Sequence, residues 1–206
     1  LAGVPWQVVN PGSNKPLIGI FQDSLLGSFR FTRPDIHFTP LQAMGLLAGY
    51  PHIDVNDLER IHKEKGHISN FDILSQIMPP ISLKYKTALY DEDEDTKISN
   101  NILEIKNGKY IRGQLDKGCF ESATKGILHR ICNDYGNMAS IAFNDHIQQI
   151  ITEFMKSSSF SVGISDLIAN RTTNETIATK IQEQKMQVQT IIDKIHRSEE
   201  YTSELQ

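Results

Sequence analysis

The residues with the clearest potential for metal chemistry form an uninterrupted acidic run at 91–95, which reads Asp-Glu-Asp-Glu-Asp. Alternating carboxylates bind magnesium when a tight turn brings their oxygens together. No glycine stands within the run to make such a turn, and its neighbours Tyr90 and Thr96 belong to no nucleotide-binding motif. The pattern therefore favours an exposed, solvated loop, and a cryptic metal enzyme built on 91–95 is the weaker alternative.

Histidine and cysteine would supply the other metal ligands and nucleophiles. His62 and His67 are five positions apart, a spacing typical of no metal site, so the seven histidines are interpreted as solvated or hydrogen-bonded side chains. Cys119 and Cys132 are too few for a disulfide framework and fit small buried residues in a reduced compartment. No glycine-rich phosphate loop or nucleophile elbow is present, so the residues alone assign no catalytic or metal-binding group.

The composition is that of a folded chain with little surplus charge. Its 206 residues suffice for one large or two small domains. The net charge of −4 depends on the acidic run, because outside it 20 acids face 21 basic residues, and no broad basic surface for nucleic acid is indicated. No apolar run approaches the ~18 residues of a membrane span. The start at Leu1, without an initiator or signal peptide, indicates a piece of a longer protein.

The apolar pattern and the turn formers predict an α+β fold with β-hairpins and helices. In chain order we expect a short buried strand over 17–21, helices from 39–42 and near 56–63 (the latter stopped at Gly66), an irregular or β region over 70–110, and helices over 122–135, from 139 and over 172–196. Thr39 begins the first helix with a capping box that Gln42 closes, and its apolar face is supplied by Leu41, Met44, Leu46 and Leu47. Asn107-Gly108 predicts a hairpin turn.

Two helices carry clear apolar stripes. The helix from 139 places these residues at helical spacing: Phe143, Ile147, Ile150, Ile151 and Phe154. The last helix begins with a capping box from Thr172 to Glu175. Its stripe consists of Ile177, Ile181, Val188, Ile191, Ile192 and Ile195. This stripe is narrow, as in a coiled-coil seam, and we expect it to need a partner helix that the chain does not supply.

An ordered series of short motifs runs through the chain. It comprises Val4-Pro5, Ser13-Asn14-Lys15-Pro16, Gly19-Ile20-Phe21-Gln22-Asp23-Ser24-Leu25-Leu26-Gly27, Met78-Pro79-Pro80-Ile81, the hairpin over 107–117, Gly126-Ile127-Leu128-His129 and Phe160-Ser161-Val162-Gly163-Ile164-Ser165-Asp166. In this order they resemble the largest subunit of multi-subunit DNA-directed RNA polymerases, of the eukaryotic or large-DNA-virus type. The resemblance covers nearly the whole chain, from Leu1 to about His196, and is strongest over 4–27.

Departures from the family pattern indicate a divergent member, for which a large DNA virus is favoured over an unusual eukaryote. Where the family has Trp-Thr-Gly-Lys-Gln, this chain has Leu89-Tyr90 and the acidic run, and Ser159 replaces a glycine at the funnel opening. The family's magnesium-binding loop, of the Asn-Ala-Asp-Phe-Asp-Gly-Asp type, does not occur. The chain is therefore expected to be an internal piece, with the catalytic aspartates encoded before Leu1.

The resemblance implies the end of the active-site region over 1–30, a pore domain over 31–156 and the start of a funnel domain over 157–196. The intact enzyme joins nucleotides into RNA by a two-metal mechanism, with magnesium bound outside this chain, so the chain alone is expected to be inactive. Asn14, Lys15, Gln22 and Asp23 would lie nearest the chemistry: Asn14 and Gln22 as hydrogen-bonding groups, Lys15 as a cation for phosphate, and Asp23 orienting a basic neighbour. The alternative is that these four residues only fix the backbone path.

The resemblance also implies partners: other polymerase subunits, the DNA template and RNA product, nucleoside triphosphates and a transcript-cleavage factor at the pore, but no membrane. The expected location is the nucleus or, for a virus, the host cytoplasm, virus factory and virion. Residues 197–206 do not continue the apolar stripe of the 172–196 helix. They are interpreted as a tail foreign to the gene, the alternative being a divergent native helix. The competing hypothesis is a free-standing, non-catalytic interaction module that uses the 172–196 helix.

Overall fold

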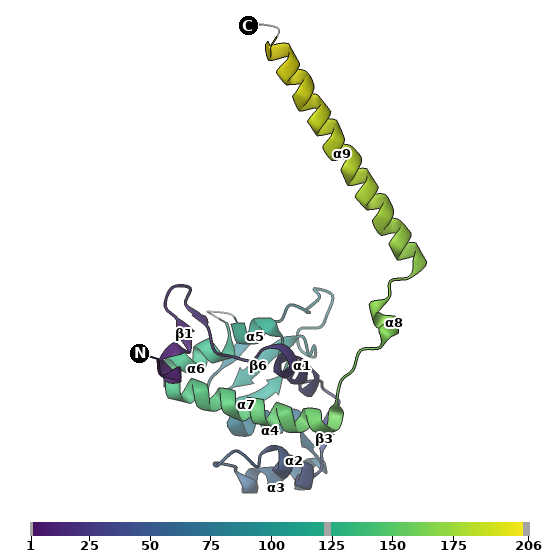
Figure 1. The fold of residues 1–206 in the computed structure, drawn as a ribbon. Coiled ribbons are helices and arrows are strands. Elements are labelled where there is room, and N and C mark those ends of the chain that lie inside the picture. The colour runs from purple at the N-terminus through teal and green to yellow at the C-terminus, as the bar shows by residue number, and fades with distance from the viewer. Residues whose placement is uncertain (1, 122–124, 204–206) are drawn as a thin grey trace. The chain divides into compact units, whose positions relative to one another are not determined.

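The computed structural model describes residues 2–121 and 125–203, and side chains beyond 196 lie outside the description. The chain divides into two compact units after Ser159. The first combines helices with small antiparallel sheets, and the second contains helices only, which confirms the expected α+β class (Figure 1). Of the tail expected to be foreign, residues 197–203 continue the last helix as backbone, and 204–206 lie outside the described residues.

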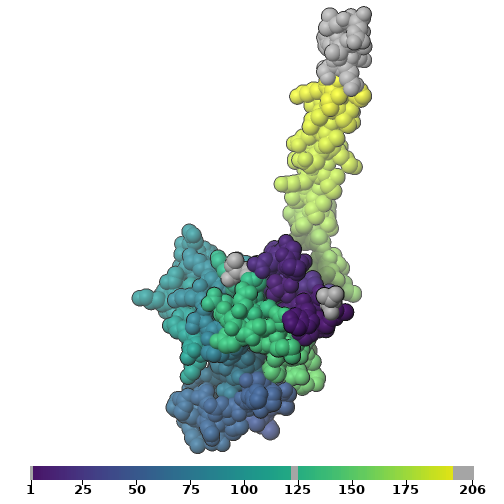
Figure 2. All heavy atoms as spheres, turned by 90° about the vertical axis from the view of Figure 1, so that its left-hand side faces the viewer, coloured from purple at the N-terminus to yellow at the C-terminus, as the bar shows by residue number. Residues whose placement is uncertain are grey.

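The first unit carries most of the elements. In chain order they are a 3-10 helix η1 (Val4–Gln7), β1 (Val9–Asn10), β2 (Lys15–Pro16), α1 (Gln22–Phe31), β3 (His37–Phe38), α2 (Pro40–Leu46), α3 (Val55–Lys65), β4 (Ile68–Ser69), α4 (Asn70–Ile77), β5 (Leu83–Lys86), β6 (Ile102–Lys106), β7 (Lys109–Arg112), α5 (Lys117–Glu121), α6 (Ile127–Tyr135) and α7 (Asn137–Ser158). The strands pair antiparallel as β1-β2, β3-β4 and β5-β6-β7. Helices α2 and α3 form the end of this unit opposite the β1-β2 hairpin (Figures 1 and 2).

Helix α7 is the centre of the core and packs against α1, α2, α4 and α6. The five apolar residues that its sequence placed on one face are all buried, which confirms that prediction. Phe154 meets Phe31 of α1 edge to face, with ring centroids 5.1 Å apart. In Figure 2 the N-terminal segment lies directly against the atoms of this helical layer. The residues after β2 therefore rest on a well-packed support.

The capping signals predicted most helix ends correctly. Thr39 and Gln42 form the expected reciprocal capping box, with the Thr39 backbone N–H 2.9 Å from Oε1 of Gln42. Helix α3 ends at Gly66, whose φ of 77° is the left-handed conformation that glycine tolerates. The expected apolar face of α2 is half wrong. Leu41 and Met44 are exposed, and the buried residues are Ala43, Leu46 and Leu47, which lie three and four positions apart.

Helices α1 and α4 were missed because short apolar runs were interpreted as strands or irregular chain, and two short helices, α5 and α8 (Ile164–Leu167), were not predicted either. Of the helix expected over 122–135, residues 122–124 lie outside the described residues and α6 begins at Ile127. The strand expected over 17–21 does not form: β2 ends at Pro16, Leu17 is exposed, and only Ile20 of this run is buried. Helix α1 follows at once. Residues 70–77 form α4 rather than β or irregular structure, because Ser69 and Asp72 make a capping box in which aspartate replaces the usual glutamate.

The three-stranded sheet confirms the predicted hairpin. Asn107 and Gly108 connect β6 to β7 with φ values of 46° and 78°, the left-handed pair that a two-residue hairpin requires. A register irregularity lies at Glu104 and Ile105 of β6. Gly113, just after β7, has φ 111°, and a Cβ there would collide with the backbone of Leu103. Glycine is therefore obligatory where the hairpin leaves the sheet.

The second unit contains the short helix α8 (Ile164–Leu167) and the long helix α9 (Arg171–Ser203). The predicted long helix is confirmed, but Thr172 lies inside it, and Oδ1 of Asn170 caps the start by accepting from the Thr173 N–H at 2.8 Å. All six stripe residues are exposed, at 39–57% of their surface. Within the described residues, no helix combines the length and apolar character that crossing a membrane would demand.

Candidate functional site

The β1-β2 hairpin carries the first two of the predicted site residues. Its strands pair Val9 with Pro16 and Asn10 with Lys15. The Asn14 N–H donates to the Asn10 carbonyl at 2.8 Å, and Asn14 itself adopts φ 51°, which asparagine tolerates better than most residues. Lys15 follows directly and is exposed. The turn thus presents a cation on a short, hydrogen-bonded support.

The Asn14 side chain is bound from beneath by His129 of α6. Nε2 of His129 lies 3.1 Å from Oδ1 of Asn14, and Nδ1 of the same ring lies 3.2 Å from Nδ2 of Asn133. His129 is only 6% exposed, so both ring nitrogens depend on these protein partners. The sequence interpretation of the histidines as hydrogen-bonded holds for His129. Its hydrogen bond to Asn14 was not predicted, because the two residues are 115 positions apart. Only the partner Asn133, one helical turn after His129, could be inferred from the sequence.

Gln22 and Asp23 occupy the first turn of α1. Gln22 has φ 47° and follows Phe21, the N-terminal capping position, and Asp23 places its carboxylate where the helix dipole favours negative charge. Both are exposed. Among the residues that the structure describes, no hydrogen bond joins either one to Asn14 or Lys15. The four predicted residues therefore form two separate pairs along one exposed segment, and no basic partner of Asp23 is seen within the described chain.

A groove of about 480 Å³ runs beside Gln22. Its walls come from α1, from the chain after β5 and from the start of α5, and they are lined by Gln22, Leu25, Phe29, Leu89, Leu115 and Lys117, among others. Asp116 at this groove is already engaged, because its carboxylate accepts from the N–H groups of Ala88 and Cys119, each at 2.9 Å. The groove is mostly apolar and offers no free carboxylate for catalysis at Asp116.

The acidic run lies in the loop between β5 and β6. Glu94 turns inward: its carboxylate accepts hydrogen bonds from Ser99 Oγ and from Nδ2 of Asn101, the latter at 2.8 Å, and these bonds, led by that of Ser99, lower its pKa. The other four acids are exposed. The expected exposed loop is therefore correct for four of the five residues. Nowhere in the described part of the chain do three histidine, cysteine, aspartate or glutamate side chains gather as a metal ion would require.

A buried carboxylate on the sheet anchors this loop. Glu104 is 6% exposed and faces Lys84, Lys106 and Arg112, with nearest N–O distances of 3.5, 2.9 and 2.9 Å. The hydrogen bond from Lys106 is the main cause that lowers the pKa of Glu104 to about 2, with Arg112 and the charge of Lys84 adding to it against the effect of burial. Arg112 also donates to the carbonyls of Thr96 and Ser99. The cluster is structural, since all three cations engage the one buried carboxylate.

The cysteines behave as inert core groups. Cys119 is fully buried, and this burial raises the pKa of its thiol to about 12. Cys132 is half-buried, and burial raises its pKa as well. Neither thiol is poised as a nucleophile.

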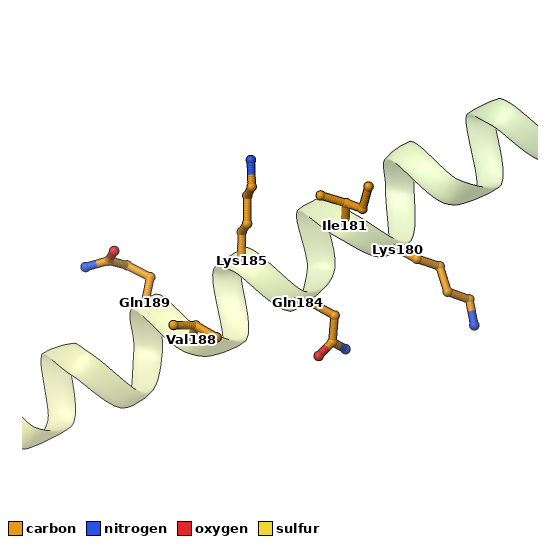
Figure 3. A pocket seen from close by; sticks show the side chains of 6 residues that line it. All are labelled: Lys180, Ile181, Gln184, Lys185, Val188 and Gln189. Atoms are coloured by element: carbon orange, nitrogen blue, oxygen red, sulfur yellow. The ribbon is translucent and has the colours of Figure 1, made fainter. Parts of the chain in front are cut away.

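The second unit presents a surface rather than a cavity. Figure 3 shows six side chains along one stretch of α9: Lys180, Ile181, Gln184, Lys185, Val188 and Gln189. They all belong to one helix, so no opposing wall encloses a ligand. Ile181 and Val188 are two of the stripe residues, and lysine and glutamine side chains flank them. This face has the composition of a helix-packing surface.

Comparison with known proteins matches these features to a family. Residues 7–167 match the family model described as RNA polymerase Rpb1, domain 3. Two curated relatives from Trypanosoma brucei brucei, DNA-directed RNA polymerase II subunit RPB1-B and subunit RPB1-A, are each 26% identical over 172 residues. In both cases the match covers 82% of this chain and 9% of the relative, so the chain spans about a tenth of the length of these proteins.

Proposed function

The chain belongs to the family of RNA polymerase Rpb1, domain 3, and on that premise we propose that it forms the pore and the start of the funnel in the largest subunit of a DNA-directed RNA polymerase. The main support is the family match over 7–167, which includes the β1-β2 hairpin and nearly all of the first unit. This match favours a polymerase subunit over a free-standing interaction module.

In this proposal the first unit lies beneath the site where nucleotides join the RNA. The intact enzyme binds the DNA template, the RNA product and nucleoside triphosphates, and a transcript-cleavage factor enters at the pore. In the intact enzyme magnesium would be bound by aspartates outside this chain, and the chain alone is expected to be inactive. The RPB1 relatives are eukaryotic, which supports a nuclear enzyme; a viral enzyme would work in the host cytoplasm and virion.

The exposed Lys15 is the residue that would act on substrate. A charge-assisted hydrogen bond between lysine and a phosphate oxygen contributes about 1.5–3 kcal/mol, which corresponds to roughly tenfold or more in apparent affinity. Asn14 and Gln22 would hydrogen-bond at the same surface, and Asp23 would orient a basic group of another segment of the subunit. All four are exposed, as contact with a partner or substrate requires.

The test is the rate of nucleotide addition by the whole polymerase carrying Lys15→Ala. We expect the KM for nucleoside triphosphates to rise about tenfold. Lys63→Ala is the matched control, because Lys63 is also an exposed lysine of the first unit, with only a surface pair to Glu59. An unchanged KM and kcat in Lys15→Ala would show that the hairpin does not contact substrate.

A further inference from the structure

We propose that His129 is a positioning residue that sets the conformation of the β1-β2 hairpin and thereby the placement of Lys15. The proposal rests on the function proposed for Lys15 where it concerns substrate. Its structural part, the coupling of His129 to the hairpin, stands on the geometry of this chain alone. His129 touches no reacting group; it acts through Asn14.

The hydrogen bonds define which ring nitrogen of His129 carries the proton. Oδ1 of Asn14 can only accept, so Nε2 must donate, and Nδ2 of Asn133 can only donate, so Nδ1 must accept. The ring is thus held as the Nε2–H tautomer between one exposed and one helical asparagine. Because His129 is 6% exposed, water cannot readily replace either partner.

The hairpin depends on this bond because its own backbone is unfavourable. Asn14 has φ 51°, in the left-handed region, which costs asparagine less than other residues with a Cβ but more than glycine. The turn within the hairpin is exposed, so packing contributes little to hold it. The bond from Nε2 of His129 offsets that cost, and the Asn14 N–H bond to the Asn10 carbonyl closes the turn.

Helix α6 also supports the segment on the far side of Lys15. A Cβ atom at Gly19 would lie 2.9 Å from Cδ1 of Leu128, closer than carbon atoms pack, so a side chain there would have to displace that of Leu128. Leu128 and His129 are consecutive, and they touch the chain on either side of residues 15–18. Two adjacent residues of α6 therefore restrain the course of the backbone that carries Lys15.

The experiment compares two substitutions of His129 whose side chains carry the same amide group and differ in length by one methylene. Nε2 of glutamine can occupy the place of the histidine Nε2, whereas Nδ2 of asparagine reaches only the place of Nδ1. His129→Gln should keep the donor to Asn14, and His129→Asn should lose it. In the full chain, we expect the backbone amide NMR signals of residues 12–15 and 17 to stay near their wild-type positions in His129→Gln and to shift in His129→Asn. Equal shifts in both variants, or none in either, would overturn the proposal.

The second arm uses the whole polymerase. His129→Asn should raise the KM for nucleoside triphosphates about as much as Lys15→Ala, roughly tenfold, with His129→Gln within about twofold of wild type. The double variant His129→Asn/Lys15→Ala should be no worse than Lys15→Ala alone, because both changes act through one group. Additive effects would contradict positioning through Lys15.

The two proposals can fail separately. If Lys15→Ala leaves nucleotide addition unchanged, the function proposed for Lys15 is wrong, while the NMR comparison still decides the coupling of His129 to the hairpin. If His129→Asn does not fold, Asn14→Ala removes the same bond from the exposed side, and Asn14→Asp keeps its acceptor. Asn14→Ala should then reproduce the amide shifts, with Asn14→Asp near wild type; the reverse order would count against the proposal.

Discussion

Gly27 of α1 lies so close to Ile151 of α7 that no side chain fits between the two helices. A Cβ atom at Gly27 would stand 3.0 Å from Cγ of Met155 and closer still to Cγ2 of Ile151. Backbone and side chain meet directly at this crossing, which holds the helix that begins with Gln22 and Asp23 against the core. The position of Gln22 and Asp23 thus depends on the absence of a side chain at Gly27.

Gly27→Ala should therefore destabilise the first unit. Overpacking of a close contact costs about 1–3 kcal/mol, and thermal unfolding of the chain should show a lower Tm. Gly45→Ala is the control, because Gly45 lies in α2 with no atom within 4 Å of its would-be Cβ. That variant should be neutral or stabilised by up to ~1 kcal/mol, as alanine favours a helix. Equal effects of the two variants would contradict the tight crossing.

Glu104 should make the stability of the chain depend on pH in the acid range. Its pKa is about 2 in the folded chain, below its ordinary value of 4.5, so the unfolded chain binds the proton more readily. The stabilisation is complete above pH 4.5 and is lost as the pH falls towards 2. Glu104→Gln should lower stability at pH 7 by about 1.5–3 kcal/mol and flatten this acid loss in denaturant titrations.

The control for Glu104 is Glu64→Gln. Glu64 pairs with Arg60 at the surface, with 57% of its side chain exposed, and such a pair contributes about 0–1 kcal/mol. If both variants had the same acid profile, the network of Glu104 with Arg112 and the two lysines would not stabilise the fold.

Alanine substitutions at Gly113 and Gly66 distinguish the cost of backbone strain from the cost of a steric collision. Both glycines have positive φ, at 111° and 77°. Gly66→Ala should cost about 1–2 kcal/mol, the strain of the left-handed region alone, because a Cβ there meets open space. Gly113→Ala adds a collision with the backbone of Leu103 and should cost more than ~4 kcal/mol, enough to unfold the sheet. Chemical denaturation measures both, and similar losses would argue against the close approach at Gly113.

The exposed stripe of α9 should make the isolated chain self-associate. Six large apolar residues are each at least 39% exposed along one helix face, and such a face packs against another helix when one is available. Sedimentation velocity should show association that grows with concentration. Ile181→Lys should reduce it, and Thr179→Lys, which adds the same charge off the stripe, should not. A sharp monomer whose α9 amides are fully protected from hydrogen exchange would contradict this prediction.

The sequence predicted correctly those elements that are determined by residues close together in the chain. The apolar spacing of α7, the Thr39 capping box and the Asn107-Gly108 turn each depend on residues within one or two turns of chain. Helix α1 was missed because its apolar residues follow a run that resembles a strand. Leu41 was assigned to the core of α2 because hydrophobicity alone does not say which face a neighbouring helix covers.

The candidate site was predictable only in part. The resemblance selected Asn14, Lys15, Gln22 and Asp23, and all four proved exposed on one segment. His129 was not selected, because the contact that gives it a role joins positions 14 and 129 and has no periodic signature. Its burial and its two asparagine partners follow from how α6 packs beneath the hairpin, which depends on tertiary structure.

The anchoring of the acidic loop determines which of its residues can mutate during evolution. Glu94 is held by Ser99 and Asn101, and Arg112 holds the carbonyls of Thr96 and Ser99. The carboxylates of Asp91 and Asp95 accept from backbone N–H groups two positions on, at 3.5 and 2.8 Å, whereas Glu92 and Asp93 make no side-chain bond among the described residues. Mutations at 92 and 93 can therefore reverse or remove surface charge with little effect on folding, while Glu94 and Asp95 should be the most conserved of the five.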